Sequence, residues 1–269
     1  MMMAGLRSAD LCVNLGSGSG PLVAWARRRT SFAPRIYKIG VTGGMASGKS
    51  TLLRLLRDTG KSIDLLDCDR LGHSTYVPGS PIYTKLLEMF GSSILLPTSE
   101  IHRPTLAKLV FQDPHSMTAF NGLVWPAIVQ SLRKKILCSE SRGMGIIVIE
   151  GAMLFEAGVD ALTDEIWALG VPEEEAVRRA VKRGFTVEQA EERIHAQLDV
   201  ESRKRMSDLF IDSYHIPREE NAVRILARLG EIEQMVQERR AQHEHWKEGE
   251  PLPCDPVLCK CPYEKDWKA

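Results

Sequence analysis

The stretch Gly43-Gly44-Met45-Ala46-Ser47-Gly48-Lys49-Ser50 decides the fold of this sequence. It matches the pattern G-x-x-x-x-G-K-[ST] in full, which is the signature of a phosphate-binding loop. Glycines let such a loop curl until its backbone N–H groups converge on phosphate oxygens. A helix that begins at the end of the loop adds the positive end of its dipole. The stretch therefore predicts a site for a nucleoside triphosphate.

Two side chains of this loop have expected roles. Lys49 is expected to reach the β- and γ-phosphates, and the Ser50 hydroxyl is expected to bind Mg²⁺. The loop alone does not distinguish a kinase from a GTPase or a motor. The sequence has no N-K-x-D motif of the kind that reads guanine, and it carries Arg179 and Arg183 on a late predicted helix. These features favour a small-molecule kinase with a mobile lid.

Strands and helices are expected to alternate along the middle of the chain. Apolar and β-branched runs predict strands, whereas apolar residues at helical spacing predict helices. The expected strands are 37–42, 62–66, 145–149, 166–171 and 209–211, and the expected helices are 50–58, 173–183, 186–197 and 218–240. Thr186 and Gln189 form a capping box that opens the third of these helices. Such alternation implies an α/β fold with a parallel sheet covered by helices on both faces.

The composition excludes several classes of protein. Of the 269 residues, 43% are hydrophobic and 26% are charged, which argues against a disordered chain, a collagen or a coiled coil. Basic and acidic residues both number 35, so the net charge gives no support to a nucleic-acid-binding protein. No long apolar run predicts a membrane-spanning helix. Six scattered cysteines indicate a reducing compartment rather than a disulfide framework.

The two ends differ from the middle. Residues 1–35 contain five arginines, one acid and a Gly/Ser run, which is typical of a mitochondrial transit segment, with a disordered leader as the alternative. Residues 241–269 are rich in turn-forming residues and predict an irregular tail. Its cysteines, Cys254, Cys259 and Cys261, lack the paired C-x-x-C spacing of common zinc sites, so free thiols are expected. A mitochondrial or cytoplasmic location follows.

A pair of carboxylates, Asp67 and Asp69, follows the second predicted strand. Residues i and i+2 of a strand end point the same way, and at the carboxyl edge of a parallel sheet they face the ligand crevice. One of them is expected to accept a proton from a substrate hydroxyl, as a kinase base does. A cap for the next helix is the alternative. Glu150, after the central strand, is a further candidate that would act on Mg²⁺ through water.

Over about residues 36–240 the chain resembles the dephospho-CoA kinases. The resemblance rests on short motifs in a fixed order: T-G-G-x-x-S-G-K-S at 42–50, D-x-D at 67–69 with His73, Pro-Gly-x-Pro at 78–81, Phe90 to Leu95, Arg103 to Phe111, Trp125 to Ile128, Leu154-Phe155-Glu156, Arg179 with Arg183, Arg193-Ile194 with Gln197, and Asp208 to Asp212. Trp125, in place of the family's usual histidine, and the run from Asp67 to Tyr76 look closest to the kinase half of the eukaryotic bifunctional CoA synthase.

This resemblance implies a P-loop NTPase fold of the nucleoside-monophosphate-kinase-like type. It implies a helical acceptor-binding subdomain over about 77–135 and a lid over about 179–205. The implied activity is ATP-dependent phosphorylation of the 3′-hydroxyl of dephospho-CoA, the last step of coenzyme A biosynthesis, with Mg²⁺. The resemblance carries no signal for an oligomeric state.

The resemblance also implies roles for individual residues. Asp69 is the first choice for the base, and Asp67 is the second choice or a ligand of Mg²⁺ beside Ser50. The other catalytic residues are Lys49, Arg179 and Arg183. ATP contacts fall to Gly43, Gly44, Met45, Ala46, Ser47, Gly48, Lys49, Ser50 and Thr51. Acceptor contacts fall to His73, Arg103, Trp125, Arg193 and Gln197.

Two other functions stay open at this level. A kinase for another small acceptor would keep the loop and the arginines but not the whole motif series. A non-catalytic nucleotide-binding protein would have no need of Asp69 or Lys49. Three residues depart from the family pattern, namely Trp125 for histidine, Gly184 for aspartate and Ser213 for asparagine. None of them lies in the phosphate loop or the D-x-D pair, so activity is expected.

Overall fold

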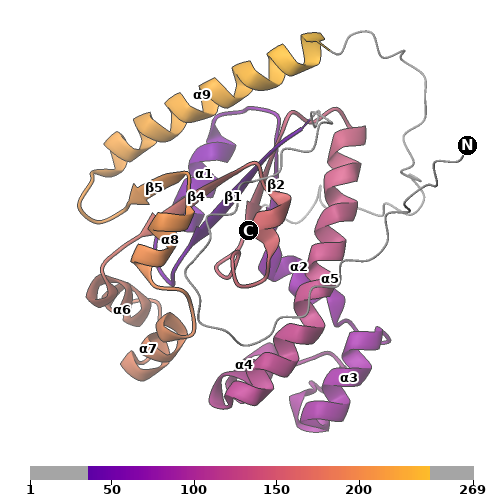
Figure 1. Ribbon diagram of the computed structural model, residues 1–269. Helices are drawn as coiled ribbons and strands as arrows, with labels where there is room; N and C mark the ends of the chain where they lie inside the picture. The colour runs from indigo at the N-terminus through magenta and orange to yellow at the C-terminus, as the bar shows by residue number, and fades with distance from the viewer. Residues whose placement is uncertain (1–35, 243–269) are drawn as a thin grey trace, which may run out of the picture. The chain divides into compact units, whose positions relative to one another are not determined.

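The computed structural model describes residues 36–242, so the leader and the cysteines of the tail lie outside the described range. A five-stranded sheet forms the centre of this part (Figure 1). Its order is β2-β3-β1-β4-β5, and every pair is parallel, as predicted. The strands are β1 (Tyr37–Gly43), β2 (Ile63–Asp67), β3 (Ile146–Glu150), β4 (Glu165–Gly170) and β5 (Leu209–Asp212).

Helices connect the strands and flank the sheet (Figure 1). They are α1 (Lys49–Asp58), α2 (Cys68–Thr75), α3 (Pro81–Phe90), α4 (Arg103–Gln112), α5 (Pro114–Ser141), α6 (Glu173–Val181), α7 (Val187–His195), α8 (Val200–Met206) and α9 (Arg218–Gln242), with the short 3-10 helices η1 (Ser92–Ile94) and η2 (Val159–Leu162). None of the helices within residues 36–242 is both long and apolar enough to cross a membrane.

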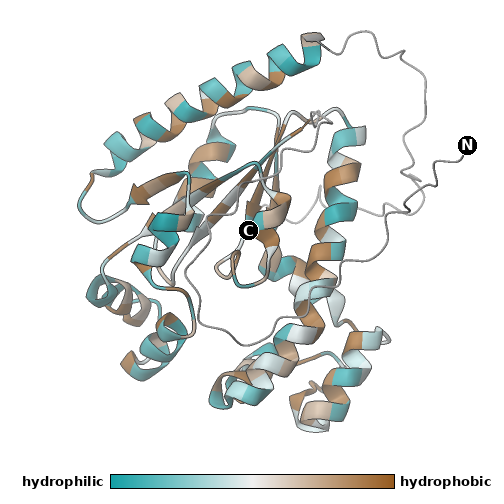
Figure 2. Ribbon diagram, in the orientation of Figure 1, coloured by the Kyte–Doolittle hydropathy of each residue, from teal (hydrophilic) through white to brown (hydrophobic). Residues whose placement is uncertain are grey.

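Two hydrophobic clusters cover the two faces of the sheet. Alternate residues of β3 show this directly: Ile147 and Ile149 pack in a cluster with α2, α4 and α5, whereas Ile146 and Val148 pack in one with α1 and α9. This pattern follows from the period of two along a strand. All four side chains are buried, as expected of a central parallel strand. Figure 2 shows the strands as mainly hydrophobic, while α6 and α7 carry many hydrophilic residues.

The ends of two helices differ from the predicted ends. Helix α6 ends at Val181 and α7 ends at His195, two residues short of the expected boundaries. Arg183 and Gln197 therefore lie beyond their helices rather than on a helical face. The predicted capping box of α7 is confirmed, because Gln189 N donates to Thr186 Oγ1 and Thr186 N donates to the Gln189 side chain.

A buried ionic network lies at the start of β4, at the end of the strands opposite the phosphate loop. The Glu165 carboxylate accepts hydrogen bonds from Tyr37 Oη at 2.9 Å, Trp167 Nε1 at 2.8 Å and the Arg228 guanidinium at 2.6 and 2.9 Å. Both carboxylate oxygens are thus used, which is how a buried charge is tolerated. This network fixes α9 to the sheet.

Candidate active site

Three neighbouring strands end at one edge of the sheet, and most of the predicted site residues follow those ends. Strand β1 ends at Gly43, β2 ends at Asp67 and β3 ends at Glu150. In the sheet register Glu150 pairs with both Asp67 and Val41. Ligands of open α/β sheets bind outside the carboxyl ends of their strands. The topology therefore brings the phosphate loop and the acidic residues together.

The phosphate loop is closely packed, and this packing requires glycine. A Cβ atom at Gly43 would lie 2.5 Å from Ser47 Oγ and 2.8 Å from the Leu169 carbonyl oxygen. Gly48, which precedes α1, has φ of 100°, in the left-handed region that favours glycine. Ala46 also has positive φ, at 59°, which costs energy in a residue with a Cβ atom. The loop has the curled backbone that the motif predicts.

Lys49 folds back over the start of the loop. Its Nζ atom donates to the carbonyl oxygens of Gly43 at 2.8 Å and Gly44 at 3.2 Å. Burial lowers the pKa of the Lys49 ammonium, while the negative charges of Glu150 and Asp69 raise it. The lysine therefore lies among the carboxylates at the ends of β2 and β3. Ser50, one residue further along α1, is exposed and accessible to a ligand.

The D-x-D pair does not lie on one strand, so that part of the sequence interpretation is wrong. Asp67 ends β2 and caps α2, where its Oδ1 accepts the Arg70 N–H at 3.0 Å. Asp69 lies two residues later, in the first turn of α2. The helix begins directly after the strand because the Asp67 side chain satisfies one of its free N–H groups. The two carboxylates still interact, since Asp67 raises the pKa of Asp69.

Three carboxyl groups in this region share one electrostatic environment. Burial, together with the charges of Asp67 and Asp69, raises the pKa of Glu150 to about 7 against the opposing effect of Lys49. Partial burial is also the main reason why the pKa of Asp69 is raised, although its side chain remains accessible. Perturbed carboxyl groups in a crevice are typical of functional sites. Within residues 36–242, no group of three or more His, Cys, Asp or Glu side chains is arranged to hold a metal ion by itself.

Arg179 connects the phosphate loop to the segment after β5. Its guanidinium donates to the Ala46 carbonyl at 3.3 Å, the Ser213 carbonyl at 3.1 Å and the Glu175 carboxylate at 2.6 Å. Arg183 lies in the exposed turn after α6, and its charge lowers the pKa of Lys49. The two arginines thus have different positions. Arg179 is held by hydrogen bonds to the phosphate loop, to Glu175 and to Ser213, whereas Arg183 is a solvent-accessible cation near the loop.

Gln197, a predicted acceptor contact, lies against the phosphate loop. Its Oε1 atom accepts the Met45 N–H at 3.2 Å and a second hydrogen bond from Arg203 Nη2 at 3.4 Å. Arg203 is buried, with 2% of its surface exposed. Sequence reasoning missed Arg203 because an arginine between Ser202 and Lys204 looks like part of a solvated charge run. No local sequence signal distinguishes it from its charged neighbours.

The predicted acceptor residues form two groups. His73 and Arg103 lie near Asp69: burial and the charge of Arg103 lower the pKa of His73, and Asp69 raises it. The His73 ring also meets Tyr76 edge-on, with centroids 6.0 Å apart. Tyr76 was not among the predicted residues. Its burial raises the pKa of its hydroxyl to about 12.

The second group comprises Trp125 and Arg193, which contact aromatic and apolar side chains. Trp125 is partly buried and packs against the cluster of α2, α4 and α5, as expected of a hydrophobic anchor. The Arg193 guanidinium lies over the ring of Phe185 at 4.8 Å and over that of Phe111 at 5.4 Å. Phe111 belongs to α4, so Arg193 connects the lid segment to the predicted acceptor subdomain.

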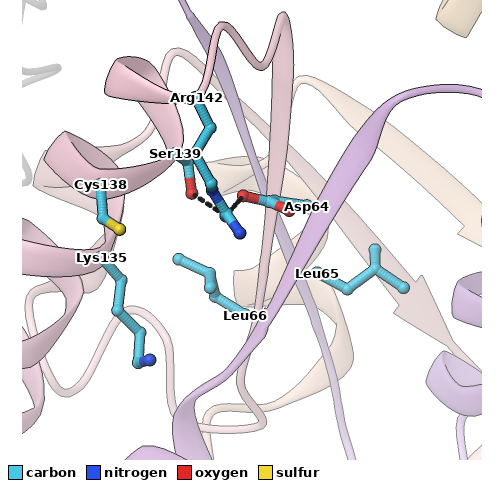
Figure 3. Close-up of a pocket in the computed structure, with 7 residues that line it drawn as sticks. All are labelled: Asp64, Leu65, Leu66, Lys135, Cys138, Ser139 and Arg142. Carbon is cyan, nitrogen blue, oxygen red and sulfur yellow. Dashed lines mark hydrogen bonds and ion pairs between the residues drawn. The ribbon is translucent and has the colours of Figure 1, made fainter. Parts of the chain in front are cut away.

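Two hollows accompany these residues. One lies between α1 and α9 beside the phosphate loop, and its lining includes Gly48, Thr51, Arg179, Ser213 and Asn221. The other lies between β2 and α5 and contains none of the predicted site residues (Figure 3). There the Arg142 guanidinium bonds to Asp64 and to Ser139 Oγ. Of these two hollows, the one between α1 and α9 adjoins the phosphate loop.

Comparisons with known proteins agree with this geometry. A family model described as dephospho-CoA kinase matches residues 37–242. The dephospho-CoA kinase of Carboxydothermus hydrogenoformans is 40% identical over 176 residues, which cover 65% of this chain and 84% of that protein. That of Moorella thermoacetica is 34% identical over 172 residues, covering 63% of this chain and 80% of that protein.

Solved structures have the same architecture. TT1252 from Thermus thermophilus aligns with a TM-score of 0.60 and 28% identity, covering 73% of this chain and 97% of that chain. The dephospho-CoA kinase from Campylobacter jejuni aligns with a TM-score of 0.53 and 20% identity, covering 71% and 96%, and shows the shared fold. Because the family model spans nearly all of the described residues, this chain belongs to the dephospho-CoA kinase family.

Proposed function

We propose that this chain transfers the γ-phosphoryl group of ATP to the 3′-hydroxyl of the ribose of dephospho-CoA, giving CoA and ADP. Family membership supports the reaction. The observation that supports it within the chain is the position of Asp69 beside Lys49, because each of these groups shifts the pKa of the other. A candidate base and a phosphate-binding cation therefore lie at the same end of the sheet.

Asp69 is the proposed base. It would accept the proton of the 3′-hydroxyl as the oxygen bonds to the γ-phosphorus and the bond from phosphorus to the leaving oxygen of ADP breaks. Its raised pKa makes it a stronger base than an ordinary aspartate, and its side chain is accessible. Asp67 is less suitable because one of its oxygens already accepts the Arg70 N–H.

Cations would stabilise the negative charge of the transferred group. Lys49 and Arg183 lie close enough for their charges to interact, and the buried guanidinium of Arg203 lies over Gly44 of the loop. Arg203 Nη1 would be 3.0 Å from a Cβ atom placed on Gly44. Positive groups preorganised at the phosphates are the main catalytic device of phosphoryl transfer. In the proposed mechanism, Lys49 binds the β- and γ-phosphates of ATP, and Arg183 and Arg203 stabilise the charge of the transferred phosphoryl group.

The residues present suit Mg²⁺, which takes oxygen ligands and keeps several waters. The exposed Ser50 hydroxyl would hold it, with Glu150 or Asp67 acting through water. When bound, the ion would supply positive charge that offsets part of the phosphate charge. The adenine of ATP would lie in the hollow between α1 and α9, bounded by Arg179 and Ser213. His73, Arg103 and Trp125 would contact dephospho-CoA.

The test is a coupled assay of ADP release by the full chain with ATP and Mg²⁺, with and without dephospho-CoA. Release that requires dephospho-CoA and yields a product with the mass of CoA is the expected result. Release with a panel of other hydroxyl acceptors, and none with dephospho-CoA, would overturn the substrate assignment. ATP binding without turnover of any acceptor would favour a non-catalytic role.

We further propose that residues 1–35 direct the chain to mitochondria, because they are rich in arginine and poor in acids. A fusion of residues 1–35 to a fluorescent protein is expected to enter mitochondria. A matched fusion in which the five arginines are replaced by glutamine is expected to stay in the cytoplasm. Cytoplasmic fluorescence of both fusions would contradict the proposal.

A further inference from the structure

Two hydrogen bonds attach the segment between α7 and α8 to the rest of the site, and a third joins it to α8. Gln197 accepts the Met45 N–H of the phosphate loop at 3.2 Å. Leu198 N donates to Glu156 Oε1, in the loop after β3, at 2.9 Å. Arg203, within α8, donates to Gln197 at 3.4 Å. The lid connection is thus bonded both to the loop that receives ATP and to Glu156.

Arg203 is a buried cation, so its guanidinium loses the hydration that would stabilise its charge in water. It is 2% exposed, and among residues 36–242 its Nε atom has no hydrogen-bond partner. Burial lowers the pKa of its guanidinium, and the charges of Glu156 and Asp199 raise it. Buried charges are tolerated only when they are paired. Of the two carboxylates, Glu156 has the larger effect on Arg203. Its negative charge therefore offsets most of the cost of burying the Arg203 guanidinium beside the phosphate loop.

Glu156 has a complementary unused atom. Its Oε2 is buried and, in the described part of the chain, has no hydrogen-bond partner, while its Oε1 is bonded to Leu198. An anionic acceptor and a cationic donor therefore lie in one buried cluster, and each has an unused hydrogen-bonding atom. Unsatisfied buried groups of this kind call for a specific explanation. Neither group would be retained here for stability alone, because a hydrophobic pair would avoid both costs.

We infer that Glu156 is a positioning residue for phosphoryl transfer, which acts through Arg203 and Leu198 rather than on the substrates. Its bond to the Leu198 N–H fixes the lid connection, and its charge keeps the Arg203 guanidinium over Gly44. The inference rests on the proposed function, because Arg203 is taken to face the transferred phosphate. The unused atoms of both side chains leave room for a direct bond between them when the lid segment moves.

The chain offers a matched control in Glu165. This residue is a buried glutamate that compensates an arginine, Arg228, whereas Glu156 is partly buried; both oxygens of Glu165 are hydrogen-bonded, and it lies at the opposite end of the strands. Glu165→Gln therefore removes a comparable buried charge without touching the site. A loss of activity that follows from reduced stability alone would appear in both variants.

The experiment compares Glu156→Gln with Glu165→Gln in the full chain. Glutamine at 156 still offers an oxygen to Leu198 but removes the charge beside Arg203. We expect kcat to fall by about 100-fold, as for small misplacements of a catalytic group, with the KM for dephospho-CoA unchanged. The dissociation constant for ATP should rise by about tenfold, typical of a lost charge-assisted contact. Glu165→Gln should lower the melting temperature but leave kcat and the dissociation constant for ATP within about twofold of the values for the unmodified chain.

A double-mutant cycle tests whether Glu156 acts through Arg203. If it does, Glu156→Gln combined with Arg203→Lys should be no slower than Arg203→Lys alone. Additive losses would overturn the inference. If Glu156→Gln does not fold, hydrogen exchange of the Leu198 amide in the unmodified chain replaces it. Slower exchange when ATP is added supports the inference, and exchange unaffected by ATP overturns it.

These outcomes separate the inference from the proposed function. Absence of dephospho-CoA-dependent turnover in the unmodified chain would contradict the proposed function itself. Normal turnover in the unmodified chain, with equal effects of Glu156→Gln and Glu165→Gln, would contradict only the role of Glu156.

Discussion

Glu150, the last residue of β3, is the register partner of Asp67, the last residue of β2. Two carboxylates on adjacent parallel strands therefore reach the same edge of the sheet, with Lys49 as the nearby cation. Like charges disfavour each other's ionisation, and burial disfavours it further. Burial and the neighbouring carboxylates together raise the pKa of Glu150 to about 7.

The raised pKa of Glu150 predicts a specific pH dependence of stability. Its pKa is about 7 in the folded chain and about 4.5 in the unfolded chain, so the folded state binds more protons between these values. The free energy of unfolding should therefore fall as pH rises from 4.5 to 7, by at most about 3.5 kcal/mol at about 1.4 kcal/mol per unit. Urea unfolding of the chain and of Glu150→Gln at pH 5, 6 and 8 measures this. The variant should lack the decline, and identical slopes would contradict the prediction.

The two aspartates should differ sharply when each is changed to asparagine. Asp69→Asn removes the proposed base, so kcat should fall by about 10²- to 10⁴-fold while ATP binding stays normal. Asp67→Asn should remain folded because asparagine caps a helix as well as aspartate does. It also removes a charge that raises the pKa of Asp69, so the acidic limb of its kcat profile should move to lower pH.

Turnover and ATP titration by calorimetry measure both effects of these substitutions. A Asp67→Asn variant as slow as Asp69→Asn would contradict the assignment of the base. An acidic limb that moves to higher pH in Asp67→Asn would contradict the electrostatic argument.

Gly43 is predicted to tolerate no side chain. A methyl group there would lie 2.5 Å from Ser47 Oγ and 2.8 Å from a backbone carbonyl, which cannot move freely. Gly43→Ala should lower the free energy of unfolding by about 1–3 kcal/mol, as for overpacking, and should abolish ATP binding. Gly122→Ala is the control, because Gly122 lies inside α5 with open space around its Cβ position. It should stabilise the chain by about 0.5–1 kcal/mol.

Arg178 and Arg179 are adjacent, and both bond to Glu175, so they form a matched pair. Only Arg179 also bonds to Ala46 of the phosphate loop and to Ser213. Arg179→Ala should raise the dissociation constant for ATP by about tenfold or more, because two charge-assisted contacts to the loop region are lost. Arg178→Ala should leave ATP binding unchanged. Equal effects in calorimetric titrations would show that Glu175 alone accounts for the role of Arg179.

Most of the fold could be predicted from the sequence because its signals are local and strong. The uninterrupted apolar run of β3 and the turn residues of the phosphate loop each specify their own structure. The capping box at Thr186 specifies the start of α7 in the same way. Family resemblance adds the identities of the site residues but not their contacts.

The details of the site were less predictable because they depend on helix ends and on tertiary contacts. The strand argument for Asp67 and Asp69 failed because Asp67 caps a helix that begins at the next residue. The prediction that Arg183 and Gln197 lie within helices was wrong because α6 ends at Val181 and α7 ends at His195. The burial of Arg203 had no local signal, since it arises from packing against a loop about 160 positions earlier in the chain.

Helix α2 carries both Asp69 and His73, one turn apart on a single eight-residue element capped by Asp67. The helix therefore fixes the spacing between the proposed base and a proposed acceptor residue, independently of the position of the lid segment. Because α3, α4 and α5 lie outside this element, changes in those helices could alter the acceptor pocket without altering that spacing. In the proposed mechanism, the position of the base and the choice of acceptor are thus set by different elements of the chain.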